Sequence, residues 1–173
     1  MKIRPARSDE TDSLSALAVA SKATWGYDEA FMERCRVELV VRDEHVERGL
    51  VNVAVDEFDT AMGFYALKEP GERDAELGLL FVAPAHLRRG VGRVLLADAC
   101  REARRRGWSV LLVESDPFAA AFYEREGAVP TARRRPRRNA SFHSLRSACS
   151  WPTSLASDSR PVNPSSGRRR RRG

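Results

Sequence analysis

The chain has 173 residues, and its 30 lysines and arginines outnumber its 24 acids, which gives a formal net charge of +6 at pH 7. This length predicts one domain with a sizeable core, and the absence of a long apolar run excludes a membrane-spanning helix. The N-terminal residues lack the apolar core of a secretion signal, and the three cysteines have no metal-binding spacing, so we expect a cytoplasmic protein that binds no metal.

Charge divides the chain into two unlike parts. Residues 131–173 contain twelve arginines and a single acid, Asp158, whereas residues 1–130 carry 18 basic and 23 acidic groups. The body is therefore mildly acidic and the tail is strongly basic. Any binding of nucleic acid is expected to depend on the tail alone.

The pattern of apolar residues in the first half of the chain predicts two helices and four strands. Ser8 or Asp9 can cap the first helix and Asp28 the second, and the charged stretch 42–48 between helix and strand is expected to be a polar connection. The helices are indicated by apolar residues at helical spacing: Leu14, Leu17 and Ala18, then Phe31, Met32, Cys35 and Leu39. Apolar runs between turn signals predict strands over residues 2–6, 50–55, 61–67 and 74–82.

The stretch 79–107 has the most informative pattern in the chain. An apolar strand run ends at Pro84, which has no N–H for a strand ladder, and a basic turn with Gly90 and Gly92 follows. Apolar residues at helical spacing then predict a helix that ends at Gly107. The first N–H groups of such a helix have no internal partner and its dipole end is positive, so the turn predicts an anion site for a pyrophosphate. A surface helix with solvated arginines is the alternative, because short glycine motifs are weakly specific.

The order of elements predicts an α/β fold. A strand over residues 108–113 and a helix over residues 118–126 complete the pattern, and the whole order predicts a mixed sheet with helices on both faces. Two adjacent strands that part around the glycine turn can open a cleft for an elongated ligand.

The last part of the chain has a different composition. Residues 131–173 lack apolar periodicity and are rich in Arg, Ser and Pro, so we predict a disordered basic tail, without strands, after a domain over residues 1–130. A change of reading frame near residue 131 would also produce such a tail and is an alternative origin for it.

Two segments resemble motifs of the GNAT N-acetyltransferase superfamily: Leu87–Gly92, with the sequence Leu-Arg-Arg-Gly-Val-Gly, and Asp116–Ala128. The resemblance covers about residues 2–130. It implies a mostly antiparallel sheet with a splayed strand pair, and acetyl-CoA as the cosubstrate. The implied reaction is direct transfer of an acetyl group to the amine of a small molecule or peptide, by a monomer or a homodimer.

The resemblance also implies which residues contact the cofactor. Backbone groups near Phe81 and Val82 would pair with the pantetheine arm, and Asp116 stands where the family commonly has an Asn that contacts the cofactor. The first position of the turn is Leu87, where Arg or Gln is usual. The CoA pyrophosphate would be held by the turn residues Leu87, Arg88, Arg89, Gly90, Val91, Gly92 and Arg93.

Tyr123 and Glu76 are the candidate catalytic residues. Tyr123 lies where the family often has a tyrosine that protonates the leaving thiolate, and the ordinary pKa values of a phenol and a thiol, about 10 and about 8.5, allow that transfer. We expect Tyr123 to face the cofactor and Phe122 to pack, with core packing of Tyr123 as the alternative. Glu76 lies on the strand that leads to the glycine turn, residues 87–93, which we call the cradle. It is the candidate base, with a solvated carboxylate as the alternative. A backbone N–H near Val82 would polarise the thioester carbonyl.

Trp25 and Tyr27 are the candidate acceptor contacts. They lie in the loop between the first two helices, which lines the acceptor pocket in the family, and aromatic packing at this turn is the alternative. Two other classes of function stay open at this point. The body could bind acyl-CoA as a sensor without turnover, or the tail could bind nucleic acid through counterion release.

Overall fold

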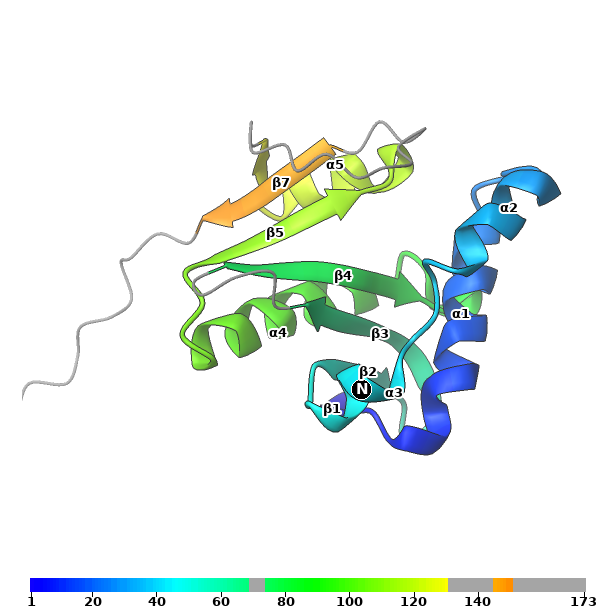
Figure 1. Ribbon diagram of the computed structural model, residues 1–173, viewed down its shortest axis with the longest axis horizontal. Helices are drawn as coiled ribbons and strands as arrows, with labels where there is room; N and C mark the ends of the chain where they lie inside the picture. Colours follow the sequence, from blue (N-terminus) through cyan, green and yellow to red (C-terminus); the bar gives the residue numbers. More distant parts are fainter. Residues whose placement is uncertain (69–73, 131–144, 151–173) are drawn as a thin grey trace, which may run out of the picture.

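The computed structural model describes residues 1–68, 74–130 and 145–150 (Figure 1). After the first strand come three helices and then three consecutive strands, and from there helices and strands alternate up to the final strand pair. Their bounds are β1 Lys2–Pro5, the 3-10 turn η1 Ser8–Glu10, α1 Thr11–Ala23, α2 Glu29–Arg36, α3 Asp43–Glu47, β2 Val51–Val55, β3 Ala61–Lys68, β4 Asp74–Val82, the 3-10 turn η2 Pro84–His86, α4 Val91–Arg105, β5 Val110–Ser115, α5 Pro117–Arg125, β6 Val129–Pro130 and β7 Leu145–Ser150.

The described strands form one mixed sheet in the order β1-β2-β3-β4-β5-β7-β6. Only the β4–β5 pair is parallel, and every other neighbouring pair is antiparallel. Helix α4 lies between β4 and β5 in the sequence and is the crossover connection that two parallel neighbours require. The expected mixed, mostly antiparallel sheet is therefore confirmed.

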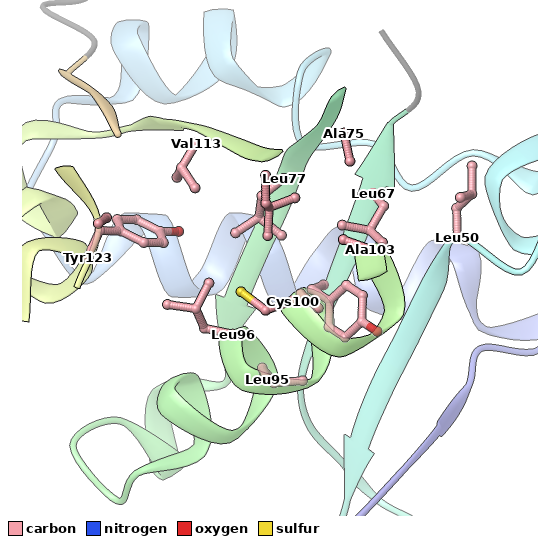
Figure 2. Close-up of a cluster of buried hydrophobic side chains, with 14 of the residues drawn as sticks. Leu50, Leu67, Ala75, Leu77, Leu95, Leu96, Cys100, Ala103, Val113 and Tyr123 are labelled. Atoms are coloured by element: carbon pink, nitrogen blue, oxygen red, sulfur yellow. The ribbon is translucent and has the colours of Figure 1, made fainter. Parts of the chain in front are cut away.

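Two apolar clusters lie on opposite faces of this sheet, as the alternation of side chains in the strands requires. On β3, Tyr65 and Leu67 join the cluster formed with α4 and α5, whereas Phe64 and Ala66 join the cluster formed with α1 and α2. Figure 2 shows the first cluster, in which side chains from α4 lie beneath those from the strands. The expectation of helices on both faces is confirmed.

The β4 and β5 strands diverge after their first four residue pairs. Their register runs from Asp74 opposite Val110 to Leu77 opposite Val113, although β4 continues to Val82. The register of β4 with β3 also shifts at this point, because Leu67 pairs with Leu77 and Ala66 pairs with Leu79, so Gly78 is an extra residue. Such a bulge bends and twists a strand. The two strands consequently form a V in Figure 1, which confirms the splayed pair.

Three details of the sequence analysis need correction. The stretch 42–48 contains the short helix α3, whose residue Val46 is buried in the cluster on the α1 side of the sheet. The helix α1 begins at Thr11 after the η1 turn, so neither Ser8 nor Asp9 caps it. The strand β7 at residues 145–150 pairs with β5 along its whole length, where no strand was expected.

Other expectations have a mixed outcome. The expected cap of the second helix is confirmed, since the Asp28 carboxylate accepts the Phe31 N–H at 2.7 Å. The rest of the predicted basic tail lies outside the described residues, and its boundary at residue 130 stays a prediction. None of the helices in the described ranges combines the length and the apolar character that a membrane span requires.

Candidate functional site

The start of α4 has backbone donors that no side chain caps. Gly90 is the N-cap residue, with φ of +82°, and no side chain caps the helix. The Val94 N–H donates to the Gly90 carbonyl at 3.2 Å, but the N–H groups of the preceding turn, Val91 to Arg93, have no carbonyl partner within an α-helix. These donors and the positive end of the helix dipole are therefore free to face a phosphate.

The turn before α4 has an unusual backbone. Arg88 has φ of +60° and Gly90 has φ of +82°, so two left-handed residues lie within three positions. A left-handed conformation is unfavourable for a residue with a Cβ, and it persists at functional sites. Successive N–H groups in such turns point to one side and form an anion-binding concavity.

The arginines of the turn differ in their surroundings. Arg88 and Arg89 are exposed, and neither makes an ion pair with another residue in the described part of the chain. The Nε atom of Arg93 lies 3.1 Å from the Glu126 carboxylate at the end of α5. Arg88 and Arg89 therefore supply the unbalanced positive charge of the turn, whereas the charge of Arg93 is partly neutralised.

Gly92 lies where three elements meet. A Cβ at this position would lie 3.5 Å from the Phe122 ring on α5 and 3.7 Å from Val82 at the end of β4. These are ordinary van der Waals distances, so packing in the protein does not by itself require a glycine here. The missing side chain leaves space beside the unpaired N–H groups. Leu87, in the same turn, is 38% exposed and donates its N–H to Pro84 at 3.4 Å.

The backbone of β4 offers donors and acceptors to the open side of the V. The Ala83 N–H donates to Met62 on β3 at 2.9 Å, and Phe81 lies opposite Phe64 in the same ladder. Residues in an antiparallel ladder alternate between bonded and non-bonded pairs, so the N–H and carbonyl of Val82 point away from β3, toward the gap before β5. Of the two residues expected at this position, Val82 presents its backbone to the gap and Phe81 does not.

Tyr123 lies in the core beside the gap. It is 6% exposed, and Figure 2 shows its ring between Val113 and Leu96, with the hydroxyl directed toward β4. Phe122 is partly buried against the same cluster, with its ring centroid 5.0 Å from that of Tyr123. Both aromatic side chains therefore pack against the cluster, and the expectation that Tyr123 faces the cofactor stays a prediction.

Glu76 lies in the closed part of the V. It is opposite Leu112 on β5, and its carboxylate lies 3.6 Å from the Nζ of Lys68 on β3. The structure therefore separates Glu76 from the Val82 end of β4 by the bulge at Gly78. The assignment of Glu76 as a general base stays a prediction.

A polar cluster with buried charged groups joins α1, the following turn and α5. The Tyr27 hydroxyl donates to Asp116 Oδ1 at 2.8 Å, and the Lys22 Nζ lies 2.8 Å from Asp116 Oδ2. Asp116 is the N-cap of α5, where it accepts the Phe118 N–H at 3.1 Å. Burial, and then the hydrogen bond to Asp116, raise the pKa of Tyr27 above its ordinary value.

Aromatic rings surround this cluster. The ring centroids of Trp25 and Phe118 are 5.8 Å apart, and those of Tyr27 and Phe31 are 4.1 Å apart. The candidate acceptor contacts Trp25 and Tyr27 thus lie together with Asp116, as the sequence analysis did not anticipate. Lys22 was missed, although a charged residue one turn after Ala18 on an apolar helix stripe is a detectable signal.

Comparison with models of known protein families identifies one family that matches the chain. The sequence model of the acetyltransferase (GNAT) family matches residues 14–128 of the chain. No curated protein sequence matches it. Among the described residues, no group of three or more His, Cys, Asp or Glu side chains is placed to hold a metal ion.

Several solved structures share the fold. The PaiA N-acetyltransferase from Thermoplasma acidophilum, solved in complex with coenzyme A, has a TM-score of 0.70 at 18% identity, over 87% of this chain and 98% of that chain. A GCN5-related N-acetyltransferase from Rhodopseudomonas palustris has a TM-score of 0.61 at 22% identity, over 85% and 91% of the two chains. N-acetylglutamate synthase from Neisseria gonorrhoeae, with coenzyme A and N-acetyl-glutamate, has a TM-score of 0.64 at 23% identity, but the match covers only 34% of that longer chain.

Proposed function

Because the chain belongs to the GNAT acetyltransferase family, we propose that it transfers an acetyl group from acetyl-CoA to an amine of a small molecule or peptide. The observation that carries this function is the coincidence of two features at one place. The splayed β4–β5 pair opens toward the end of β4, and the uncapped start of α4 lies directly after it.

The residues fit an elongated ligand with a diphosphate. The N–H groups at the start of α4 and the exposed side chains of Arg88 and Arg89 would hold the diphosphate. The outward backbone groups of Val82 would bind the amide-containing arm, since they face the gap as a strand edge does. Acetyl-CoA, when bound there, supplies the activated acetyl group.

The chain's own residues would then prepare the acceptor and stabilise charge. The N–H of Val82, which points away from β3, would donate to an oxygen that becomes negative in the gap. Tyr123, whose hydroxyl is directed toward β4 in Figure 2, would donate a proton to the departing sulfur. The amine must lose a proton before it attacks, and Glu76, directly or through water, is the proposed base.

The decisive experiment measures coenzyme binding and turnover together. We expect calorimetric uptake of CoA by the purified protein, and acetylation of at least one amine in a mass-spectrometric panel supplied with acetyl-CoA. Gly92→Glu places a carboxylate in the cradle and should weaken CoA binding by at least about a hundredfold, because a like charge next to the diphosphate opposes its binding. Ser109→Glu, an exposed position next to β5, is the matched control and should bind as the wild type does.

The outcomes separate enzyme from sensor. No uptake of CoA, or equal uptake by wild type and Gly92→Glu, contradicts the proposed site. Uptake without turnover of any amine favours the sensor, and the pairing of Glu76 with Lys68 at 3.6 Å is the observation that favours this second candidate. Turnover of an amine by the wild type, together with weaker CoA binding by Gly92→Glu, supports the acetyltransferase.

A further inference from the structure

We infer that Lys22 is a positioning residue for the acceptor side: its ion pair with Asp116 fastens the turn after α1 to the start of α5 across the open end of the splayed strands. This role rests on the proposed acetyl transfer and deepens it. It concerns which residue sets the affinity for the acceptor amine, and it assigns no part of the chemical step to Lys22.

The ion pair is unusually buried. The Lys22 and Asp116 side chains are 9% and 7% exposed, and their charged atoms lie 2.8 Å apart. Among residues 1–68 and 74–129, Lys22 is the only basic residue that is buried. Its ammonium also lies 5.4 Å from the ring centroid of Trp25 and 5.3 Å from that of Tyr27. Removal of charge from water is costly, so such a pair is weak evidence for a stabilising role and better evidence for a specific one.

The two partners belong to the two arms of the V. Helix α1, which carries Lys22 in its last turn, packs on β3 and β4. Asp116 directly follows β5. Since β4 and β5 share no register beyond Leu77, the ion pair joins parts that the sheet no longer connects at that end. Figure 1 shows α1 and α2 beside the open end of the V.

The link also fixes the two aromatic candidates for acceptor binding. Tyr27 donates to the same carboxylate as Lys22, and Trp25 packs against Phe118 at 5.8 Å on the exposed side. Phe118 is 62% exposed, so these rings border solvent rather than the deep core. Loss of the ammonium leaves the Asp116 charge unbalanced, and the turn that carries Trp25 and Tyr27 should then shift away from α5.

Three variants test the role. Lys22→Met removes the cation, Asp116→Asn removes the anion but keeps an N-cap acceptor for α5, and the double variant removes both charges. We expect each single variant to raise the KM for the acceptor by at least about tenfold with kcat within about threefold of wild type, because ground-state positioning is lost and the reacting groups are not. The double variant should recover to within about threefold of the wild-type KM, since no buried charge is then unpaired. Lys2→Met, at an exposed position of β1, is the matched control.

The results discriminate between explanations. A Lys22→Met enzyme whose acceptor KM is within twofold of wild type overturns the role, and so does a double variant that is no better than the singles. A structural role alone would lower the melting temperature of the single variants with the KM of the folded fraction unchanged, which also overturns it. These outcomes require an active wild type, so they differ from failure of the proposed function, in which the wild type neither binds CoA nor acetylates.

Amide hydrogen exchange tests the ion pair even if the wild type neither binds CoA nor acetylates an amine. Amide hydrogen exchange of the segment 24–31 should accelerate in Asp116→Asn and return to the wild-type rate in the double variant, because the exchange rate reports local opening. Unchanged exchange in Asp116→Asn shows that the ion pair does not hold the turn, whether or not the protein acetylates amines.

Discussion

Gly92 is a residue at which the stability of the protein and the affinity for CoA should change in opposite directions. Its φ is not in the left-handed region, and a Cβ there would meet Phe122 and Val82 at ordinary contact distances. Gly92→Ala should therefore stabilise the free protein, by up to about 1 kcal/mol from helix propensity. The added methyl group lies beside the N–H groups of the cradle, so the Kd for CoA should rise by about tenfold, or about 1.4 kcal/mol.

Chemical denaturation and calorimetry on the same Gly92→Ala preparation measure the two effects. Gly90→Ala is an informative companion, because Gly90 has φ of +82° and should lose stability on substitution, by about 1 kcal/mol. Equal CoA affinity in wild type and Gly92→Ala would contradict the position of the cradle.

A substitution at Tyr123 can separate the packing role of its ring from the chemical role of its hydroxyl. Tyr123→Phe keeps the ring in the cluster with Val113 and Leu96 and removes only the hydroxyl. We expect kcat to fall by about a hundredfold, the lower end of what a general acid contributes, with the Kd for CoA little changed. Steady-state kinetics with calorimetric binding test this expectation. A kcat within twofold of wild type would leave Tyr123 as a core residue only.

The residues of the site differ in how far the sequence could predict them. The cradle around Gly90 was predictable, because glycine conformation and helix ends are local properties. The ion pair of Lys22 with Asp116 was not, since the two residues are 94 positions apart and meet only when α1 crosses the open end of the V. Asp116 was expected to contact a cofactor, and in the structure its carboxylate binds side chains of this chain.

At the scale of elements, an ion-pair cluster joins β1, η1 and the turn between β2 and β3. The Asp59 carboxylate accepts from Arg4 at 2.8 Å and from Arg7 at 2.7 Å, and Arg4 also pairs with Glu10 at 2.8 Å. Hydrogen bonds from Arg4 and then Arg7 lower the pKa of Asp59 to about 2, and the hydrogen bond from Arg4 lowers that of Glu10. The cluster ties the edge strand β1 to the neighbouring hairpin.

This cluster predicts a loss of stability in acid. A carboxylate whose pKa is lower in the folded state stabilises the protein above its unfolded pKa, near 4, and the contribution is lost as the pH falls toward the folded value. The melting temperature of wild type should therefore drop between about pH 4 and pH 2 more steeply than that of Asp59→Asn. Asn tolerates the left-handed backbone of this position, whose φ is +64°, so the variant isolates the charge. Parallel melting curves across this pH range would contradict the assignment.

The splay of β4 from β5 shows where element-level prediction ends. Apolar runs and turn signals indicated both strands, but the sequence analysis placed their separation at the glycine turn. The structure places it at Gly78, because the bulge there changes the register of β4 with β3. A register depends on pairing partners that are distant in sequence, so alternation along β4 could not reveal that Glu76 lies before the bulge and Val82 after it.

At the scale of the molecule, β7 determines how the sheet ends. It pairs with β5 from Leu145 to Ser150, and the two-residue strand β6 pairs with β7. Its sequence carries Arg and Ser among few large aliphatics, so an apolar pattern did not reveal it. Backbone pairing along an existing strand explains how such a sequence can still add to a sheet.

Two truncations test this pairing. A chain ending at residue 150 keeps β7 and should melt within about 2 °C of the full chain, whereas a chain ending at residue 130 exposes the outer edge of β5 and removes the partner of β6. The shorter chain should melt several degrees lower, since each kcal/mol is worth about 2–4 °C in a domain of this size. Thermal unfolding of the three chains measures the difference. Equal melting temperatures for all three would show that β7 adds nothing to stability.

The same three chains test whether the basic tail binds nucleic acid. Residues 131–173 carry twelve arginines, of which six lie beyond residue 150. If each arginine neutralised one phosphate of duplex DNA, the slope of log K against log salt concentration would be about −11 for the full chain and about half of that for the chain ending at 150. The acidic body should bind no DNA in the chain ending at 130, because 23 acids outnumber 18 basic groups there. Fluorescence anisotropy at several salt concentrations gives these slopes. Binding of equal strength by the full chain and the body alone would assign the contact to the cradle arginines Arg88 and Arg89 instead of the tail.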